Sequence, residues 1–107
     1  MDTKSTASAF AALGHPSRVS ILRLLVQAGE AGLSVSQMRT HLEMPATTFG
    51  HHLKAMADAG LIRQQRQGRS LISVADYSVL RDLISFLMDD CCRGVLTSES
   101  NQALETI

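Results

Sequence analysis

Aromatic residues are scarce in this sequence, which has no tryptophan, one tyrosine and three phenylalanines among its 107 residues. Hydrophobic residues still make up 45% of it, which is enough for one compact domain in a chain too short for two. No apolar run approaches the roughly 20 residues that span a bilayer. The N-terminus MDTKSTASAF lacks the basic start and apolar core of a signal peptide. We therefore expect a single domain, residues 1–107, that is cytoplasmic and has no membrane partner.

Cysteine is also rare, and the two cysteines are neighbours, Cys91 and Cys92. Two adjacent cysteines form no disulfide framework, so a reducing compartment fits. A catalytic constellation is lacking as well. His51 and His52 lie near Lys54, but no nucleophile, phosphate loop or paired carboxylate accompanies them, and consecutive helical residues do not converge. We expect the protein not to be an enzyme.

What the sequence does contain is a segment, residues 35–53, that predicts two short helices joined by a tight turn. Met38 and Leu42 are four residues apart, the spacing of one buried stripe. Pro45 then interrupts the helical ladder, and a second helix is expected from about Ala46. Its apolar positions are Phe49, Leu53, Met56 and Ala57. This pattern is typical of a helix-turn-helix that reads DNA, although a helical hairpin with a solvated polar face has the same pattern.

The other face of the second helix is polar. Thr47, Thr48 and His51 lie near its N-terminus, where contacts with base edges are expected. Lys54 and Arg39 are better placed for phosphates. We therefore name these five residues as candidate DNA contacts.

Charge is balanced over the whole chain but not along it. A formal net charge of zero by itself argues against a nucleic-acid partner, because phosphates require local cations. Residues 34–74, however, hold five basic and two acidic residues, whereas the rest of the chain holds five basic and eight acidic residues. The positive charge thus collects around the predicted helix-turn-helix.

A β-hairpin is predicted immediately after the second helix. Residues 61–67 and 69–74 flank Gly68, and the second of these segments is rich in β-branched residues. The tip would display Arg66 and Arg69, which suits the wing of a winged-helix protein that contacts a minor groove or the DNA backbone. An ordinary solvated turn remains the alternative.

The N-terminal part predicts two further helices. A first helix from Ser5 to Leu13, within an N-terminal dimerisation segment 1–13, ends at Gly14. A second begins at Pro16 and is apolar almost all round, so we expect it to be the central buried helix. Residues 33–35 fit either a strand or the entry to the next helix.

The last predicted helix has an unusually broad apolar surface. Asp76 is expected to cap a helix that runs from Tyr77 to about Cys92, within a dimerisation segment 76–93. Its apolar residues are Val79, Leu80, Leu83, Ile84, Phe86, Leu87 and Met88. A small domain cannot bury them all internally, so we expect a dimer through the first and last helices. Residues 94–107 are expected to form a flexible tail.

Three phrases in this order resemble the ArsR/SmtB family of bacterial repressors: AALGHPSRVSILRLL, TTFGHHLKAMADAGLI and RQQRQGRSLISV. The resemblance runs from about Ala9 to about Leu87. It implies a mainly α, winged helix-turn-helix fold with about five helices and a small β-hairpin as the wing. It also implies a homodimer on a palindromic operator, with DNA affinity lowered by a metal ion, a metalloid or a redox signal.

The sequence departs from the inducer sites of this family. One family site uses a C-x-C pair on the first helix of the reader, where this chain has SQMRTHL. Another holds zinc-like ions with carboxylates and histidines on the last helix, which here has aspartates but no histidine. Some arsenic-responsive relatives carry two adjacent cysteines at the end of this helix and a third cysteine downstream. This chain has the adjacent pair but no downstream cysteine. Cys91 and Cys92 remain as the candidate metal ligands.

Thiolates select thiophilic ions such as trivalent arsenic or antimony. Neighbouring residues on a helix point about 100° apart, so both sulfurs can bind one ion only if the helix end unwinds, which Gly94 would permit. A metalloid that needs three ligands would take one from the other subunit or keep a non-protein ligand, whereas a mono-substituted organoarsenical needs two. We therefore expect no permanently bound cofactor, and As(III), Sb(III) or a trivalent organoarsenical as inducer.

Three alternatives remain open for the cysteines and the fold. A redox- or persulfide-responsive repressor could use the same thiols, although Asp89, Asp90 and the helix dipole disfavour the thiolate. A disulfide between adjacent residues is awkward because their Cα atoms lie about 3.8 Å apart, but an intersubunit disulfide is possible. The cysteines could also be small hydrophobes in an interface, or the protein an interaction module with a degenerate reader.

Overall fold

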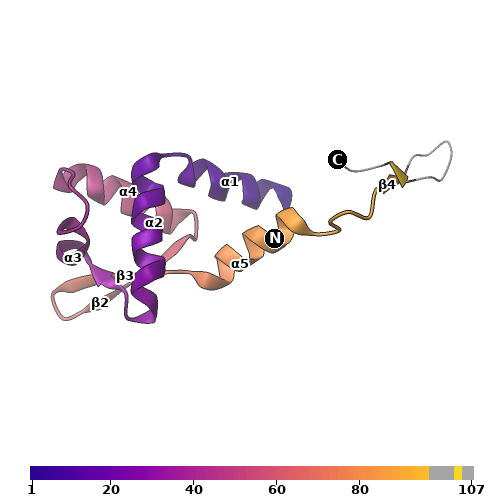
Figure 1. Ribbon diagram of the computed structural model, residues 1–107. Helices are drawn as coiled ribbons and strands as arrows, with labels where there is room; N and C mark the ends of the chain where they lie inside the picture. Colours follow the sequence, from indigo (N-terminus) through magenta and orange to yellow (C-terminus); the bar gives the residue numbers. More distant parts are fainter. Residues whose placement is uncertain (97–102, 105–107) are drawn as a thin grey trace.

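The computed structural model describes residues 1–96 and 103–104, and its mainly α fold with a hairpin confirms the predicted winged helix-turn-helix class (Figure 1). The helices are α1 (Thr3–Leu13), α2 (Pro16–Ala28), the 3-10 turn η1 (Gly29–Ala31), α3 (Val35–Arg39), α4 (Ala46–Asp58) and α5 (Tyr77–Met88). The strands are β1 (Leu33–Ser34), β2 (Ile62–Gln67), β3 (Ser70–Ala75), β4 (Val95–Leu96) and β5 (Ala103–Leu104). One antiparallel sheet has the order β1-β3-β2, and β4 pairs with β5.

Local capping explains where the first two helices begin. The Asp2 side chain accepts a hydrogen bond from the Ser5 amide at 2.7 Å, so α1 starts at Thr3, two residues before the predicted Ser5. His15 caps α2, because its Nδ1 accepts from the Ser17 amide at 3.2 Å.

Residues 33–35 form both a short strand and the start of the next helix, the two possibilities that the sequence left open. Leu33 pairs with Ser73 and Ser34 with Ile72, which makes β1 a short edge strand. Ser34 then starts α3, since its hydroxyl accepts from the Gln37 amide at 3.2 Å while the Gln37 side chain accepts from the Ser34 amide at 2.8 Å.

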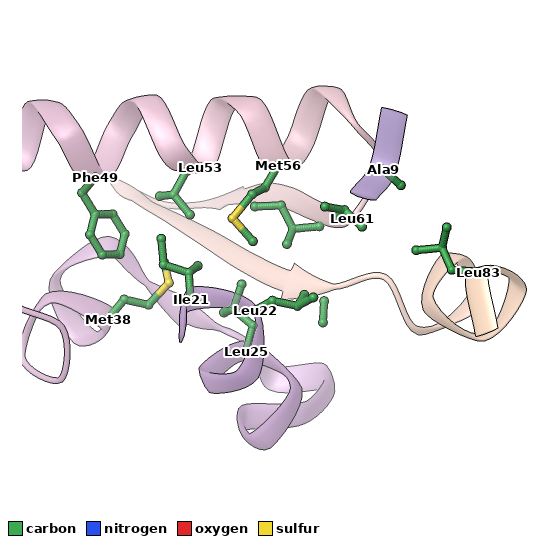
Figure 2. Close-up of a cluster of buried hydrophobic side chains, with 12 residues drawn as sticks. Ala9, Ile21, Leu22, Leu25, Met38, Phe49, Leu53, Met56, Leu61 and Leu83 are labelled. Atoms are coloured by element: carbon green, nitrogen blue, oxygen red, sulfur yellow. The ribbon is translucent and has the colours of Figure 1, made fainter. Parts of the chain in front are cut away.

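The core lies between the sheet and the helices α2, α3 and α4. The largest fully buried apolar side chains come from α2, α3, α4 and the segment before β2: Ile21, Leu25, Met38, Phe49, Met56 and Leu61. Figure 2 shows Phe49 and Leu53 of α4 directed toward Met38 and Ile21 on the opposite side. This packing fixes α4 with one face inward.

The expectation that α2 is buried all round is wrong. Val19 and Val26 are 43% and 42% exposed, whereas Ile21, Leu22 and Leu25 are buried. The elements that pack against α2, namely α1, α4, η1 and β3, cover the side that carries Ile21, Leu22 and Leu25 but leave Val19 and Val26 partly open to solvent.

A glycine is required where η1 meets the sheet. Gly32 has φ of 67°, a conformation that side chains with a Cβ rarely adopt. A Cβ at this position would also lie 2.4 Å from the Ser73 carbonyl oxygen in β3. Any larger residue must therefore displace the strand that carries one side of the hairpin.

The last helix is shorter than predicted and ends at Met88 rather than near Cys92. Two consecutive reverse turns follow it, in which the Cys91 amide donates to the Met88 carbonyl at 3.0 Å and the Arg93 amide to the Asp90 carbonyl at 3.4 Å. Asp90 and Cys92 have positive φ values of 58° and 67°. Apolar periodicity also stops at Met88, whereas the expected end at residue 92 relied on Gly94 as the first helix breaker.

The predicted flexible tail, residues 94–107, is only partly covered by the structure. Val95 and Leu96 pair with Leu104 and Ala103, while residues 97–102 and 105–107 lie outside the described residues. Within the described part, no helix is both long and apolar enough to cross a membrane.

Candidate nucleic-acid interface

Helix α4 presents a polar ridge to solvent. Its buried residues are Phe49, His52, Leu53 and Met56. The exposed residues on the opposite side include Thr47, Thr48, His51 and Lys54, which we call the recognition ridge. The structure thus places all four where the periodicity predicts, and their contact with DNA stays a prediction.

The start of α4 is left open to solvent. Pro45 precedes it with an extended backbone, φ −60° and ψ 146°, and no side chain caps the first turn. The amides of Thr47 and Thr48 therefore have no side-chain acceptor at the positive end of the helix dipole, which favours a nearby anion such as a DNA phosphate.

Lys54 is paired, but only weakly. Its Nζ lies 3.0 Å from Asp58 Oδ2, and the two side chains are 74% and 66% exposed. An ion pair this exposed contributes little to stability, so the lysine can turn toward a phosphate at small cost.

The β2–β3 hairpin, here called the wing, carries the two arginines predicted for its tip. Arg66 pairs with Leu71 in the last part of the ladder, and Arg69 lies in the two-residue turn. Gly68 has φ of 63°, which matches the first central position of a type II′ turn. Both arginines are exposed. Arg63, by contrast, lies at the base of the wing, 3.9 Å from Glu30 and 3.7 Å from Asp76.

Arg39 ends α3 beside an open hollow of about 490 Å³. Its other lining residues are Ser36, Thr40, Glu43 and Met44. The Thr40 hydroxyl donates to the Gln37 carbonyl at 2.6 Å, where α3 gives way to the turn. Helix α3 ends at Arg39, so Leu42, which shares the predicted stripe with Met38, lies in the turn after the helix.

Comparisons with known proteins agree with this geometry. A helix-turn-helix domain family matches residues 13–65. An HTH-type transcriptional regulator of Methanocaldococcus jannaschii is 32% identical over 65 residues, which are 61% of this chain and 71% of that protein. The ArsR-like transcriptional regulator from Rhodococcus sp. RHA1 superposes with a TM-score of 0.69 at 31% identity, covering 78% of this chain and 76% of that one. The chain belongs to the ArsR family of transcriptional regulators.

Another solved structure is similar to this ArsR-family regulator. It is the homodimeric winged helix-turn-helix DNA-binding domain, fragment 1–100, of a possible ArsR-family regulator from Mycobacterium bovis. The two share 27% identity and a TM-score of 0.64, with 82% of each chain covered.

Beneath the recognition ridge, the ArsR-family regulator holds a cluster of basic side chains. Arg18 Nε donates to His52 Nδ1 at 2.9 Å, and Arg18 Nη1 donates to the Ala12 carbonyl at 3.1 Å. The His15 ring lies 4.6 Å from the His52 ring, centroid to centroid. Burial, and then the nearby positive groups, lower the pKa of His52. The role of Arg18 is missed by sequence reasoning, because α2 also contains Arg23 and nothing local distinguishes the two arginines.

The two cysteines of this regulator lie in the turns after α5, and both are exposed. A hydrogen bond with the Cys92 thiol raises the pKa of Cys91. Because neither cysteine is helical, the 100° separation expected for helical neighbours does not apply. No cluster of three or more histidine, cysteine or acidic residues suited to a metal ion occurs in the described part of the chain.

Proposed function

We propose that the protein is a dimeric repressor that binds operator DNA and leaves it when trivalent arsenic, antimony or an organoarsenical binds Cys91 and Cys92. The observation that carries the DNA-binding part is the recognition ridge, exposed along α4 above a buried apolar face. The wing with Arg66 and Arg69 follows α4 directly in the chain (Figure 1).

The dimensions of α4 suit a major groove. Its 13 residues form a rod about 20 Å long, and the groove of B-DNA, about 12 Å wide, admits one α-helix. Thr48 and His51 would meet base edges, while Lys54 and Arg39 would meet phosphates. The wing arginines would contact the neighbouring backbone or minor groove.

Exposed apolar side chains support a homodimer. Ile84, Leu87 and Met88 of α5 are 63%, 60% and 60% exposed, and Phe10 of α1 is 42% exposed. Met1 and Phe86 line one hollow, so the start of the chain lies against α5. Because about half of each such side chain is already buried, covering the rest would contribute about 1 kcal/mol per residue. The Mycobacterium bovis relative is homodimeric.

The position of the thiols supports a role in release. Cys91 and Cys92 are exposed neighbours in the two turns that directly follow α5. A thiophilic centre bridging both sulfurs would constrain the turns that end the proposed dimer helix. The coupling needed to release DNA is about 1–3 kcal/mol, the usual range between two sites.

The redox- or persulfide-responsive alternative is less favoured by the chemistry of these thiols. The raised pKa of Cys91 reduces the fraction of thiolate, which is the form that attacks an oxidant or a persulfide donor. Trivalent arsenic can displace the thiol proton on binding and needs no preformed thiolate.

The inducer assignment is tested with a fluorescent duplex that the protein selects from a random pool. We expect phenylarsine oxide to lower its affinity about 5- to 150-fold in anisotropy measurements, because that is the range of typical couplings. The variant with both Cys91→Ser and Cys92→Ser should bind the same duplex and ignore the arsenical.

Zinc serves as the ion control, because it should not release DNA from the unaltered protein. Release of the double serine variant by phenylarsine oxide would rule out the proposed site. Release by peroxide together with a covalent dimer on a non-reducing gel would favour the redox alternative instead.

A further inference from the structure

The buried face of α4, opposite the recognition ridge, contains a histidine, His52. His52 is 6% exposed, and the other buried polar residues of the described chain, Thr6 and Ser73, do not titrate near neutral pH. It is adjacent in sequence to His51 of the recognition ridge, but on the opposite, inward side of α4.

One hydrogen-bond chain joins three helices at this histidine. His52 Nδ1 accepts from Arg18 Nε of α2 at 2.9 Å, so that nitrogen cannot carry a proton and the neutral ring has its proton on Nε2. Arg18 also donates to the carbonyl of Ala12 in α1 at 3.1 Å. The imidazole thus fixes α4 against α2 and against α1, the first of the two proposed dimer helices.

The groups that face His52 are basic or neutral. From α2 and its cap come Arg18 and His15, from α4 itself His51, and from α1 the Ala12 carbonyl. On β2, which also packs against α4, Arg63 is paired with carboxylates at the base of the wing. A proton on His52 would therefore add a positive charge beside Arg18 and remove the acceptor that Arg18 uses.

We propose that His52 is a positioning residue for DNA binding, whose protonation releases α4 from Arg18 and lowers operator affinity in acid. The inference rests on the proposed DNA-binding function of α4. Protonated His52 must leave its site next to Arg18, and the recognition ridge moves with the helix. A dimer must place its two recognition ridges in major grooves one helical turn apart, so a small movement of α4 in each subunit lowers the affinity for the operator.

The direction of the pH dependence follows from the environment. Burial, His15 and Arg18 hold the pKa of His52 below its ordinary 6.5. Affinity is therefore retained above pH 6.5 and is lost as pH falls through the pKa of His52 in the folded protein. One linked proton limits the loss to about tenfold per pH unit.

The test compares the dissociation constant for the selected duplex at pH 5.0–7.5, with each protein normalised to its own value at pH 7.5. The unaltered protein should lose affinity toward the acid end of this range, by no more than about tenfold per pH unit. In His52→Asn the amide oxygen occupies the place of Nδ1 and accepts from Arg18 without titrating, so the loss should disappear. His15→Asn keeps a good cap on α2 but removes a neighbouring positive group, so the loss should begin at higher pH.

The possible results of this test separate the role of His52 from the proposed DNA-binding function. An acid loss in His52→Asn equal to that of the unaltered protein would overturn the proposal, as would an unaltered protein with a flat profile. Failure of the unaltered protein to bind duplex at pH 7.5 would contradict the proposed function itself. If His52→Asn does not fold, nitrogen-15 NMR of the unaltered protein decides: the Nε2–H form of His52 should disappear at the same pH as DNA affinity, and a mismatch contradicts the proposal.

Discussion

Replacing Ile84 and Leu87 by aspartate together is expected to produce a monomer whose operator affinity is at least about a hundredfold lower. Both side chains are more than half exposed on α5, and two carboxylates there would have to be buried in the proposed dimer without partners. A monomer carries one recognition ridge instead of two, and linking two binding modules typically strengthens binding 10²- to 10⁴-fold. Sedimentation velocity and fluorescence anisotropy on the same samples measure both effects.

Ser78→Asp is the matched control for this double variant. Ser78 is exposed and lies in the first turn of the same helix, outside the stripe formed by Ile84, Leu87 and Met88. An added carboxylate is tolerated near a helix N-terminus, so the control should remain dimeric and bind DNA. A double aspartate variant that is still dimeric would place the interface elsewhere.

Removing both wing arginines, Arg66→Ala with Arg69→Ala, should weaken binding to every duplex alike. Each arginine that neutralises a phosphate contributes about one unit to the slope of affinity against salt, and a dimer carries two wings with two such arginines each, so the slope should fall by about four. At low salt we expect a loss of about a hundredfold. The measurement is a salt titration with the selected duplex and a scrambled one of equal composition.

The ridge substitutions Thr48→Ala and His51→Ala are the matched comparison for the wing. Contacts with base edges discriminate between sequences by about 1–3 kcal/mol each, so these changes should reduce the preference for the selected duplex over the scrambled one. Wing arginines that affect the selected duplex alone would contradict their assignment to the backbone.

Much of the reader could be predicted because its signals are local. The spacing of Phe49, Leu53 and Met56 fixes which side of α4 is buried, and Pro45 fixes where that helix can begin. The tip of the wing follows from Gly68, whose positive φ allows a two-residue turn.

The features that could not be predicted depend on contacts between residues far apart in the sequence, or on a segment that contains no strong helix-breaking residue. Arg18 meets His52 across 34 residues, a separation at which no periodicity operates. The two-residue strand β1 exists because β3 lies beside it. After Met88 the residues Asp89 to Cys92 neither favour nor forbid a helix strongly, so tight turns replace the last predicted turn.

The most direct test of the account is to locate the DNA contact on the protein. Nitrogen-15-labelled protein titrated with the selected duplex should show its largest amide shifts at residues 47–54 of α4 and at Gly68 and Arg69 in the wing. The exposed side of α2, at Val19 and Val26, should not change. Large shifts on α2 with an unperturbed α4 would contradict the claim that the ridge of α4 enters the groove.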